Sequence, residues 1–317
     1  MRARLSVTIL AAALAASACK SERHAGPATP PTPAAGDASV AIAPPTTAPA
    51  PAPGGVIAKP FLWKAEKKGK AAFLFGTVHL GIDAESALPP WVWLRFDQAK
   101  SFAMETDIND PSLMTAVMRT DGKTLDKELG AEYWEKLEAV LGKILADNVK
   151  GFKASAAATL VAVQGLPMTL PMDLVLKQKA ERGGKQIVYL EEAQKQQALL
   201  DKWMDVRMLR FLLDDIENQK KRNKDLVAAY RAGDEKAVVD LGDESVLEEA
   251  GLSRAERDQS MKEMLYDRNA AWVPAIEKMI ADGGGFIAVG AMHLVGDRSV
   301  LKLLEDKGYE ISRVTGP

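Results

Sequence analysis

Cysteine and histidine are both scarce in this chain, which has one cysteine and three histidines among 317 residues. A lone cysteine cannot form a disulfide within the chain, and no C-x-x-C pair is present to build a zinc ribbon. The sequence also contains no H-E-x-x-H, Walker or G-x-S-x-G motif. The common zincin, nucleotide-binding and hydrolase-elbow classes are therefore not supported, and any histidine chemistry must rest on another pattern.

An excess of charge of one sign is missing as well. The formal net charge is −2, and the lysines and arginines are scattered along the chain rather than clustered. The sequence therefore lacks an electrostatic footprint for nucleic acid, and neither DNA nor RNA is expected as a partner. Hydrophobic residues make up 47% of the chain, which is ample for a core. Beyond the N-terminal segment, no apolar run approaches the length that a membrane-spanning helix needs.

The first 18 residues have the organisation of an export signal. Arg2 and Arg4 form a positively charged start, and the apolar run from Leu5 to Ala16 is too short for a good membrane span. Small residues precede Cys19, and this arrangement resembles a bacterial lipoprotein signal in which Cys19 becomes the lipidated first residue of the mature chain. The alternative is an ordinary signal peptide that is cleaved after Ala18.

Residues 19–58 are predicted to form a disordered tether. The stretch Pro27–Gly55 consists mainly of Ala, Pro, Thr and Gly and has no aromatic residue. Such a composition cannot bury a core and favours an extended, polyproline-like chain. With an acyl chain such as palmitate at Cys19, the tether would hold the folded part off a membrane of the bacterial cell envelope, facing the periplasm. The residues after Cys19 are Lys20 and Ser21, and neither is the Asp that resembles an inner-membrane retention signal. This difference favours the outer membrane.

Two short stretches with the same pattern organise the rest of the chain. Phe73–Leu80 and Phe286–Leu294 each contain an apolar run, a glycine, two further residues, a histidine and a leucine. An apolar run that ends in glycine predicts a buried strand followed by a sharp turn. The histidines, His79 and His293, then lie just beyond the carboxyl ends of two strands, where ligands bind in open α/β sheets. We therefore expect the two imidazoles to face one site.

The remaining pattern predicts one domain over residues 59–317 of the α/β (α+β) class, with strands at both ends and a large helical insertion in the middle. The predicted strands are Phe61–Ala65, Ala71–Gly76, Ser101–Asp107, Gln186–Leu190, the run before His293, and Tyr309–Val314. The main predicted helices are Trp91–Lys100, Ala131–Leu145, Ala154–Val163, Met172–Glu181, Ala193–Asn218, Asp225–Arg231, Glu235–Leu241, Arg254–Tyr266, Asn269–Ala281 and Ser299–Lys307. Pro274 is expected to cut or kink the helix that contains it.

Four of these strand ends carry polar groups, namely His79, Glu105, Glu191 and His293. Imidazole and carboxylate are common ligands of zinc, manganese and cobalt, and a carboxylate outside the ligand set can act as a general base. Arg268, at a helix boundary, is a candidate for stabilising negative charge on an intermediate. Each residue also has a plain structural reading. The histidines can be hydrogen-bonded structural residues, Glu105 a helix cap or a solvated carboxylate, Glu191 a helix-start carboxylate, and Arg268 an exposed helix residue.

Several ordered stretches of the chain resemble the TraB/PrgY/GumN family, which is similar to the Tiki metalloproteases. They are Leu74–Leu80, Met104–Asp107, Pro171–Asp173, Tyr189–Gln196, Asp267–Trp272 and Ala288–Gly296. The resemblance implies a Tiki-like α/β fold with a divalent metal site. By matching position, His79 and His293 are the box histidines, Glu105 and Glu191 the two acidic residues, and Arg268 the arginine of an Arg-Asn pair. Glu192 departs from the family pattern, since Thr is usual there.

These observations lead to one hypothesis and two alternatives. The hypothesis is a lipid-anchored, metal-dependent hydrolase of peptide or protein substrates. His79, Glu105 and His293 would bind Mn, Co or Zn, Glu191 would serve as the base or as an outer carboxylate, and Arg268 would stabilise the oxyanion. The first alternative is a non-catalytic envelope protein that binds or sequesters a peptide or another partner at the same site. The second is a scaffold in which both histidines are structural.

Overall fold

The computed structural model describes residues 54–242 and 245–317. The predicted export signal, Cys19 and most of the predicted tether lie outside the described residues. Ordered packing includes Ile57, whose backbone N donates to Ala87 O at 2.8 Å and whose side chain is buried. In the part of the chain that the structure describes, no helix combines the length and the apolar character that crossing a bilayer requires.

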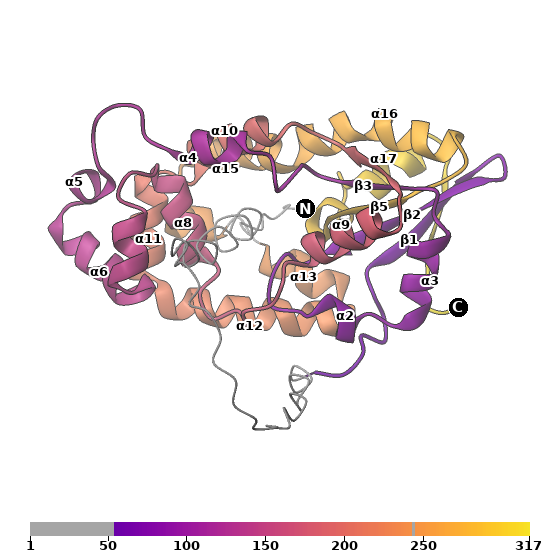
Figure 1. Cartoon of the computed structure of the whole chain (residues 1–317), viewed down its shortest axis with the longest axis horizontal. Coiled ribbons are helices and arrows are strands. Elements are labelled where there is room, and N and C mark those ends of the chain that lie inside the picture. Colours follow the sequence, from indigo (N-terminus) through magenta and orange to yellow (C-terminus); the bar gives the residue numbers. More distant parts are fainter. Residues whose placement is uncertain (1–53, 243–244) are drawn as a thin grey trace, which may run out of the picture.

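A six-stranded sheet forms the centre of one end of the molecule (Figure 1). Its strand order is β4-β3-β5-β2-β1-β6. Strands β4, β3, β5 and β2 are parallel neighbours, and β1 runs antiparallel to both β2 and β6. The predicted α+β class is therefore confirmed. The strands are β1 (Leu62–Lys67), β2 (Lys70–Thr77), β3 (Ser101–Met104), β4 (Gln186–Tyr189), β5 (Phe286–Gly290) and β6 (Glu310–Arg313).

The first two predicted strands, Phe61–Ala65 and Ala71–Gly76, are confirmed as β1 and β2 and form a hairpin. Strands β1 and β2 pair from Leu62↔Phe75 to Lys67↔Lys70, and Lys68 and Gly69 form the turn between them. Both turn residues have positive φ, 53° and 72°. A two-residue turn of this kind matches the right-handed twist of the strands, which is why glycine at the second position favours a hairpin here.

The two histidine-containing stretches are neighbours in the sheet. Strand β2 pairs with β5 in parallel, with Gly76 opposite Val289 and Thr77 opposite Gly290. The carboxyl ends of the two strands therefore lie side by side, although 213 positions separate Thr77 from Gly290. Below this edge, four phenylalanine rings pack between the sheet and a helix, with centroid distances of 5.1 Å for Phe96–Phe286, 5.5 Å for Phe96–Phe102 and 5.7 Å for Phe75–Phe286. This packing fixes β2, β3 and β5 relative to one another.

Helices make up more than half of the residues that the structure describes. They are α2 (Ala84–Ala87), α3 (Pro90–Gln98), α4 (Ser112–Val117), α5 (Leu125–Leu129), α6 (Ala131–Leu141), α7 (Lys143–Asn148), α8 (Ala154–Ala162), α9 (Met172–Arg182), α10 (Ala193–Trp203), α11 (Val206–Asp214), α12 (Ile216–Ala232), α13 (Glu235–Leu241), α14 (Ser245–Glu249), α15 (Arg254–Met261), α16 (Asp267–Ala281) and α17 (Val300–Asp306). A π-helix, η1 (Lys262–Tyr266), joins α15 to α16, and a 3-10 turn, η2 (Ala291–His293), follows β5.

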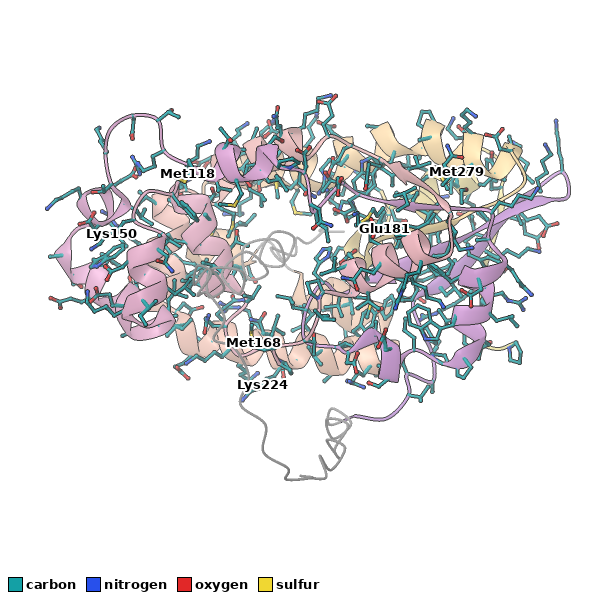
Figure 2. The ribbon with its side chains drawn as sticks, in the orientation of Figure 1. Met118, Lys150, Met168, Glu181, Lys224 and Met279 are labelled. Atoms are coloured by element: carbon teal, nitrogen blue, oxygen red, sulfur yellow. The ribbon has the colours of Figure 1, made fainter. Side chains whose placement is uncertain are left out.

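The helical insertion lies at the opposite end of the molecule from the sheet. Helices α5, α6, α8 and α11 gather there, and α12 and the α15–α16 segment run along the two long sides (Figure 1). Figure 2 shows Met118 and Lys150 at this helical end, whereas Met279 of α16 lies at the sheet end. Helix α8 is buried at every one of its nine residues, as its small apolar sequence predicts.

Three predicted helix boundaries are wrong. The helix predicted over Ala131–Leu145 ends at Leu141, because Gly142 adopts φ +79° and begins α7. The long helix predicted over Ala193–Asn218 is divided, since Asp205 accepts from Met208 N and caps a new helix, α11. Helix α12 then includes the separately predicted Asp225–Arg231. Pro274 lies inside α16 without ending it.

Candidate active site

The site lies along the carboxyl ends of the four parallel strands. In sheet order β4, β3, β5 and β2, these strands are followed by Glu191, Glu105, His293 and His79. The backbone of Glu191 continues the sheet for one more bond, because Glu191 N donates to Glu105 O at 2.9 Å. Four polar side chains that are far apart in sequence therefore come from one edge of the sheet, as expected for parallel strands.

Gly290 marks the point at which three of these side chains converge. A Cβ atom built on Gly290 would lie 3.3 Å from Glu105 Oε1, 3.5 Å from His79 Nε2 and 3.5 Å from His293 Cδ2. Because His79 Nε2 and His293 Cδ2 are both within 3.5 Å of this Cβ position, they are at most 7.0 Å apart. The absence of a side chain at position 290 therefore leaves the space in which the two imidazoles and the carboxylate face one another.

His79 is oriented by a buried carboxylate. Its Nδ1 lies 2.6 Å from Asp173 Oδ2, and the other carboxylate oxygen accepts from Thr77 Oγ1 at 3.0 Å. Asp173 is in the first turn of α9 and is 5% exposed. Burial lowers the pKa of the His79 imidazole, but the Asp173 carboxylate more than offsets this effect and the pKa is raised. Nδ1 is therefore the protonated nitrogen that donates to Asp173, and Nε2 lies near Gly290.

His293 is oriented by a neutral amide instead. Its Nδ1 donates to Asn269 Oδ1 at 2.6 Å, and Asn269 Nδ2 donates to Arg298 O at 2.8 Å, which fixes the orientation of the amide. The Trp272 ring packs against the imidazole with a centroid distance of 4.5 Å. Burial lowers the pKa of His293 to about 3, so this imidazole is neutral at physiological pH. Its Nε2 is therefore an acceptor, and it lies 3.7 Å from Glu105 Oε1.

Both carboxylate oxygens of Glu105 accept hydrogen bonds. Its Oε1 accepts from Gly290 N at 2.7 Å, and its Oε2 accepts from Arg268 Nη2 at 2.8 Å and from Gln196 Nε2 at 3.0 Å. Burial raises the pKa of this carboxyl, but His293, Arg268 and His79, with the Gly290 N–H, lower it to about 2. Arg268 is the permanent positive charge among these partners, because His293 is neutral above about pH 3. Glu105 is therefore ionised.

Arg268 and Glu191 form a bidentate pair at the other side of Glu105. Arg268 Nη2 and Nε donate to Glu191 Oε1 at 2.5 and 3.1 Å, and Nε also donates to Oε2 at 3.0 Å. The side chains of Arg268 and Glu191 are 5% and 11% exposed. Burial raises the pKa of Glu191, although Arg268 acts in the opposite direction. Glu191 is thus a carboxylate whose proton affinity is increased by its surroundings, as a general base requires.

A π turn places two consecutive residues against the same histidine. In η1, Asp267 N donates to Lys262 O, five residues earlier, and the wider turn immediately precedes Arg268 and Asn269. Arg268 Nη1 lies 3.3 Å from His293 Nε2 while Asn269 holds Nδ1 of the same ring. Both ring nitrogens of His293 are therefore contacted from adjacent positions of one helix.

The structure brings all five predicted site residues together, and it adds residues that the sequence did not single out. Glu105 is buried at the site rather than solvated, and Arg268 is buried rather than exposed. Asp173, Asn269 and Gln196 were not predicted to have a role. The role of Asp173 was missed because a carboxylate in the first turn of a helix is ordinarily explained by the helix dipole. Asn269 and Gln196 lie on helices, and no local pattern connects them to a strand end.

The donor chemistry of the site fits a divalent transition metal. Each of the two imidazoles is held through Nδ1 by an oxygen acceptor, and such a bond is usual for histidines that bind a metal through Nε2. Within residues 54–242 and 245–317, however, no group of three or more His, Cys, Asp or Glu side chains is placed closely enough to hold an ion. The predicted ligands His79, Glu105 and His293 therefore have donor atoms that suit a metal ion. In this structure, however, Arg268 pairs with the carboxylates of the site.

The structure is thus an α+β domain in which two histidines, two glutamates and an arginine form a buried polar site at the carboxyl ends of the parallel strands. The family model for the TraB/PrgY/gumN family matches residues 61–313, and the chain belongs to this family.

The chain is also similar to metalloproteases. The Metalloprotease TIKI2 of Danio rerio and that of Xenopus tropicalis are each 24% identical to this chain. The matched region covers 79% of this chain in both cases, and 60% and 59% of the two relatives. The Metalloprotease TIKI1 of Homo sapiens is 24% identical over 79% of this chain and 61% of its own length. The chain thus spans about 60% of these relatives. No solved structure shows significant similarity to it.

Proposed function

We propose that this protein is a metal-dependent hydrolase that acts on peptide bonds. The convergence of His79 Nε2, His293 and Glu105 Oε1 around Gly290 carries the proposal. The similarity to the TIKI metalloproteases supports it. His79, Glu105 and His293 would hold the cation, for which Mn, Co and Zn are the candidates. A bound divalent cation of this kind would supply an activated water and polarise the scissile carbonyl.

The remaining residues of the site are proposed to orient and to move protons. Glu191, with its pKa raised by burial, would act as the base or as an outer carboxylate. Arg268 holds Glu191 through two nitrogens and thereby fixes the direction of its carboxylate. Its third nitrogen, Nη1, faces His293 and is the donor that would stabilise negative charge on a carbonyl oxygen. Asp173 and Asn269 keep the two imidazoles in their orientations.

Cleavage of a peptide library by the full chain purified in detergent tests this proposal. We expect products whose formation is abolished by a chelator and restored by added Mn²⁺, Co²⁺ or Zn²⁺. The Glu191→Gln variant should retain the divalent cation and lose turnover by a factor of about 10² or more. Equal cleavage by wild type and by the double variant His79→Ala/His293→Ala would refute the proposal.

A second function is favoured by the way in which Arg268 occupies the site. If the guanidinium permanently satisfies Glu105 and Glu191, the site can bind a peptide or another partner without hydrolysing it. Turnover distinguishes the two functions. A peptide that binds to the protein, remains intact on prolonged incubation and is insensitive to chelator would favour the binding function.

We further propose that the protein is anchored by a lipid on Cys19 in the bacterial cell envelope, with the outer membrane preferred, and faces the periplasm. The arrangement of charge, apolar run and small residues before Cys19 supports this location. Labelled palmitate should be incorporated into the wild type and not into a Cys19→Ser variant. Recovery of the Cys19→Ser variant in the same membrane fraction as the wild type would contradict a lipid anchor.

A further inference from the structure

Every nitrogen of the Arg268 guanidinium contacts the site. Nε and Nη2 donate to Glu191, and Nη2 also donates to Glu105 Oε2 at 2.8 Å. Nη1 donates to Met264 O at 2.9 Å and lies 3.3 Å from His293 Nε2. The guanidinium therefore touches two of the three proposed metal ligands, His293 and Glu105, at the same time.

The charges of the site show why this arginine is needed. Glu105 and Glu191 are two adjacent carboxylates with side chains 5% and 11% exposed, and Arg268 is the cation that contacts both. Asp173, the third buried carboxylate nearby, is paired with His79 instead. Without a positive charge, two buried carboxylates would face each other at a large electrostatic cost. The guanidinium compensates both carboxylates through direct contacts.

We infer that Arg268 is a built-in cation of this site, which holds the position between Glu105, Glu191 and His293 and competes there with a divalent cation. The inference rests on the proposed metal site and goes beyond it, since it makes the affinity for metal depend on opening the contacts of Arg268 with His293 and Glu105, while its pair with Glu191 can persist. A lone pair on His293 Nε2 accepts one donor at a time, so the contact with Nη1 must open before that nitrogen can bind a cation. Repulsion between the guanidinium and a dication a few ångströms away acts in the same direction.

The competition accounts for one feature of the described residues. The donor types of a metal site are present at the ends of β2, β3 and β5, yet no three of them are close enough together to hold an ion. Glu105 is drawn toward Arg268 and Gln196 through Oε2, and its Oε1 accepts from Gly290 N. The site is therefore arranged around a guanidinium rather than around a smaller ion.

Metal titration of the full chain in detergent tests this inference. Metal-free wild type, Arg268→Met and Arg268→Lys would be titrated with MnCl₂, CoCl₂ and ZnCl₂ by calorimetry, with circular dichroism as the check on folding. Arg268→Met removes the charge and keeps much of the volume. Arg268→Lys keeps the charge, but a single ammonium cannot contact Glu105, Glu191 and His293 together. Arg254→Met is the matched control, because the Arg254 side chain is 88% exposed and pairs with Asp258 at 4.0 Å instead of with a residue of the site.

We expect Arg268→Met to bind the divalent cation at least tenfold more tightly than wild type, Arg268→Lys to lie between them, and Arg254→Met to match wild type. If Arg268→Met does not fold, tighter binding by Arg268→Lys decides in favour of the inference. Equal or weaker binding by the Arg268 variants, with measurable binding by wild type, overturns the inference and leaves the proposed metal site intact. A failure of all the proteins to bind any of the three cations overturns both.

Discussion

The two imidazoles of the site are held by acceptors of different charge. Asp173 places an anionic oxygen behind His79, whereas Asn269 places a neutral one behind His293. An anionic acceptor makes the opposite ring nitrogen a stronger donor to a metal, because it stabilises positive charge on the imidazole. At the scale of single residues, His79 is therefore expected to be the stronger of the two histidines that are proposed to bind the metal.

Replacing Asp173 with Asn tests the contribution of that charge. The amide oxygen still accepts from His79 Nδ1, so we expect the fold to persist while the affinity for Mn²⁺, Co²⁺ or Zn²⁺ falls by a factor of about 10 to 100. Titration calorimetry measures the change. Glu181→Gln is the control, since Glu181 lies on the same helix, α9, and pairs with Lys177 instead of with the site (Figure 2). An unchanged affinity in Asp173→Asn would show that orientation alone, and not charge, is what Asp173 provides.

At the scale of elements, Gly76, next to the last residue of β2, and Gly290, the last residue of β5, have different tasks although their sequence contexts match. A Cβ on Gly76 would lie 3.0 Å from the backbone Cα of Ala291 and 3.1 Å from Phe61 Cβ. A Cβ on Gly290 would instead enter the space between Glu105, His79 and His293. Gly76 therefore permits the close packing of β2 against the turn after β5, and Gly290 keeps the site open.

Alanine at each position should separate these tasks. We expect Gly76→Ala to reduce the free energy of unfolding by about 1–3 kcal/mol, because backbone atoms must move to admit the methyl group. Gly290→Ala should cost less than about 1 kcal/mol, because φ at Gly290 is −51° and suits alanine, but it should weaken metal binding at least tenfold. Urea denaturation and metal titration measure the two effects. The same loss of stability with no loss of metal binding in both variants would contradict the assignment.

Elements with a strong local signal were predictable from the sequence, and their long-range contacts were not. The hairpin around Gly69, the buried helix α8 and the strands β2 and β5 follow from apolar pattern and turn residues. The division of the predicted helix after Trp203 was missed, because the apolar pattern continues across Met204 while Asp205 caps a new helix. The π turn before Arg268 was also missed, since the sequence on both sides of it has helical character.

The same distinction applies to the site. His79, Glu105, Glu191 and His293 were predictable because each follows a strand, and parallel strands bring such positions to one edge. Asp173 and Asn269 were not, because each acts on a histidine 94 or 24 positions away through a single hydrogen bond. The engagement of Arg268 with both glutamates could not be read from sequence either. It depends on the order β4-β3-β5 in the sheet, which places Glu191 beside Glu105.

At the scale of the whole molecule, the site depends on contacts between the two ends of the domain. Strand β1 pairs with β6, with Trp63 opposite Arg313, and β2 pairs with β5. The helical insertion between them contributes Asp173 and Gln196, while Arg268 comes from the helix that leads back to the sheet. The histidine and glutamate side chains are therefore assembled only in the complete fold, so that their ionisation is coupled to the stability of the whole domain.

This coupling predicts a loss of stability in mild acid that depends on His293. In the unfolded chain the imidazole takes up a proton near pH 6.5, whereas burial lowers its pKa to about 3 in the folded protein. The unfolded state therefore binds one more proton between these values, and stability falls as the pH is lowered through this window. Between pH 7 and pH 4 the contribution is roughly 3 kcal/mol, taking 1.4 kcal/mol for each pH unit. Glu105, with its pKa lowered to about 2, adds a further loss below pH 4.5.

The variant His293→Gln isolates this effect, because its side chain is neutral at every pH. His79 acts in the opposite direction, since its pKa is raised in the fold and its contribution is present below pH 6.5 and lost as the pH rises through the folded value. That contribution is common to both proteins and cancels in the difference between them. Urea denaturation of the metal-free proteins, with chelator present, should therefore show wild type losing about 3 kcal/mol more than His293→Gln from pH 7 to pH 4. Parallel pH profiles for the two proteins would mean that His293 is protonated in the fold, and that its Nε2 is not the free acceptor on which the proposed metal site depends.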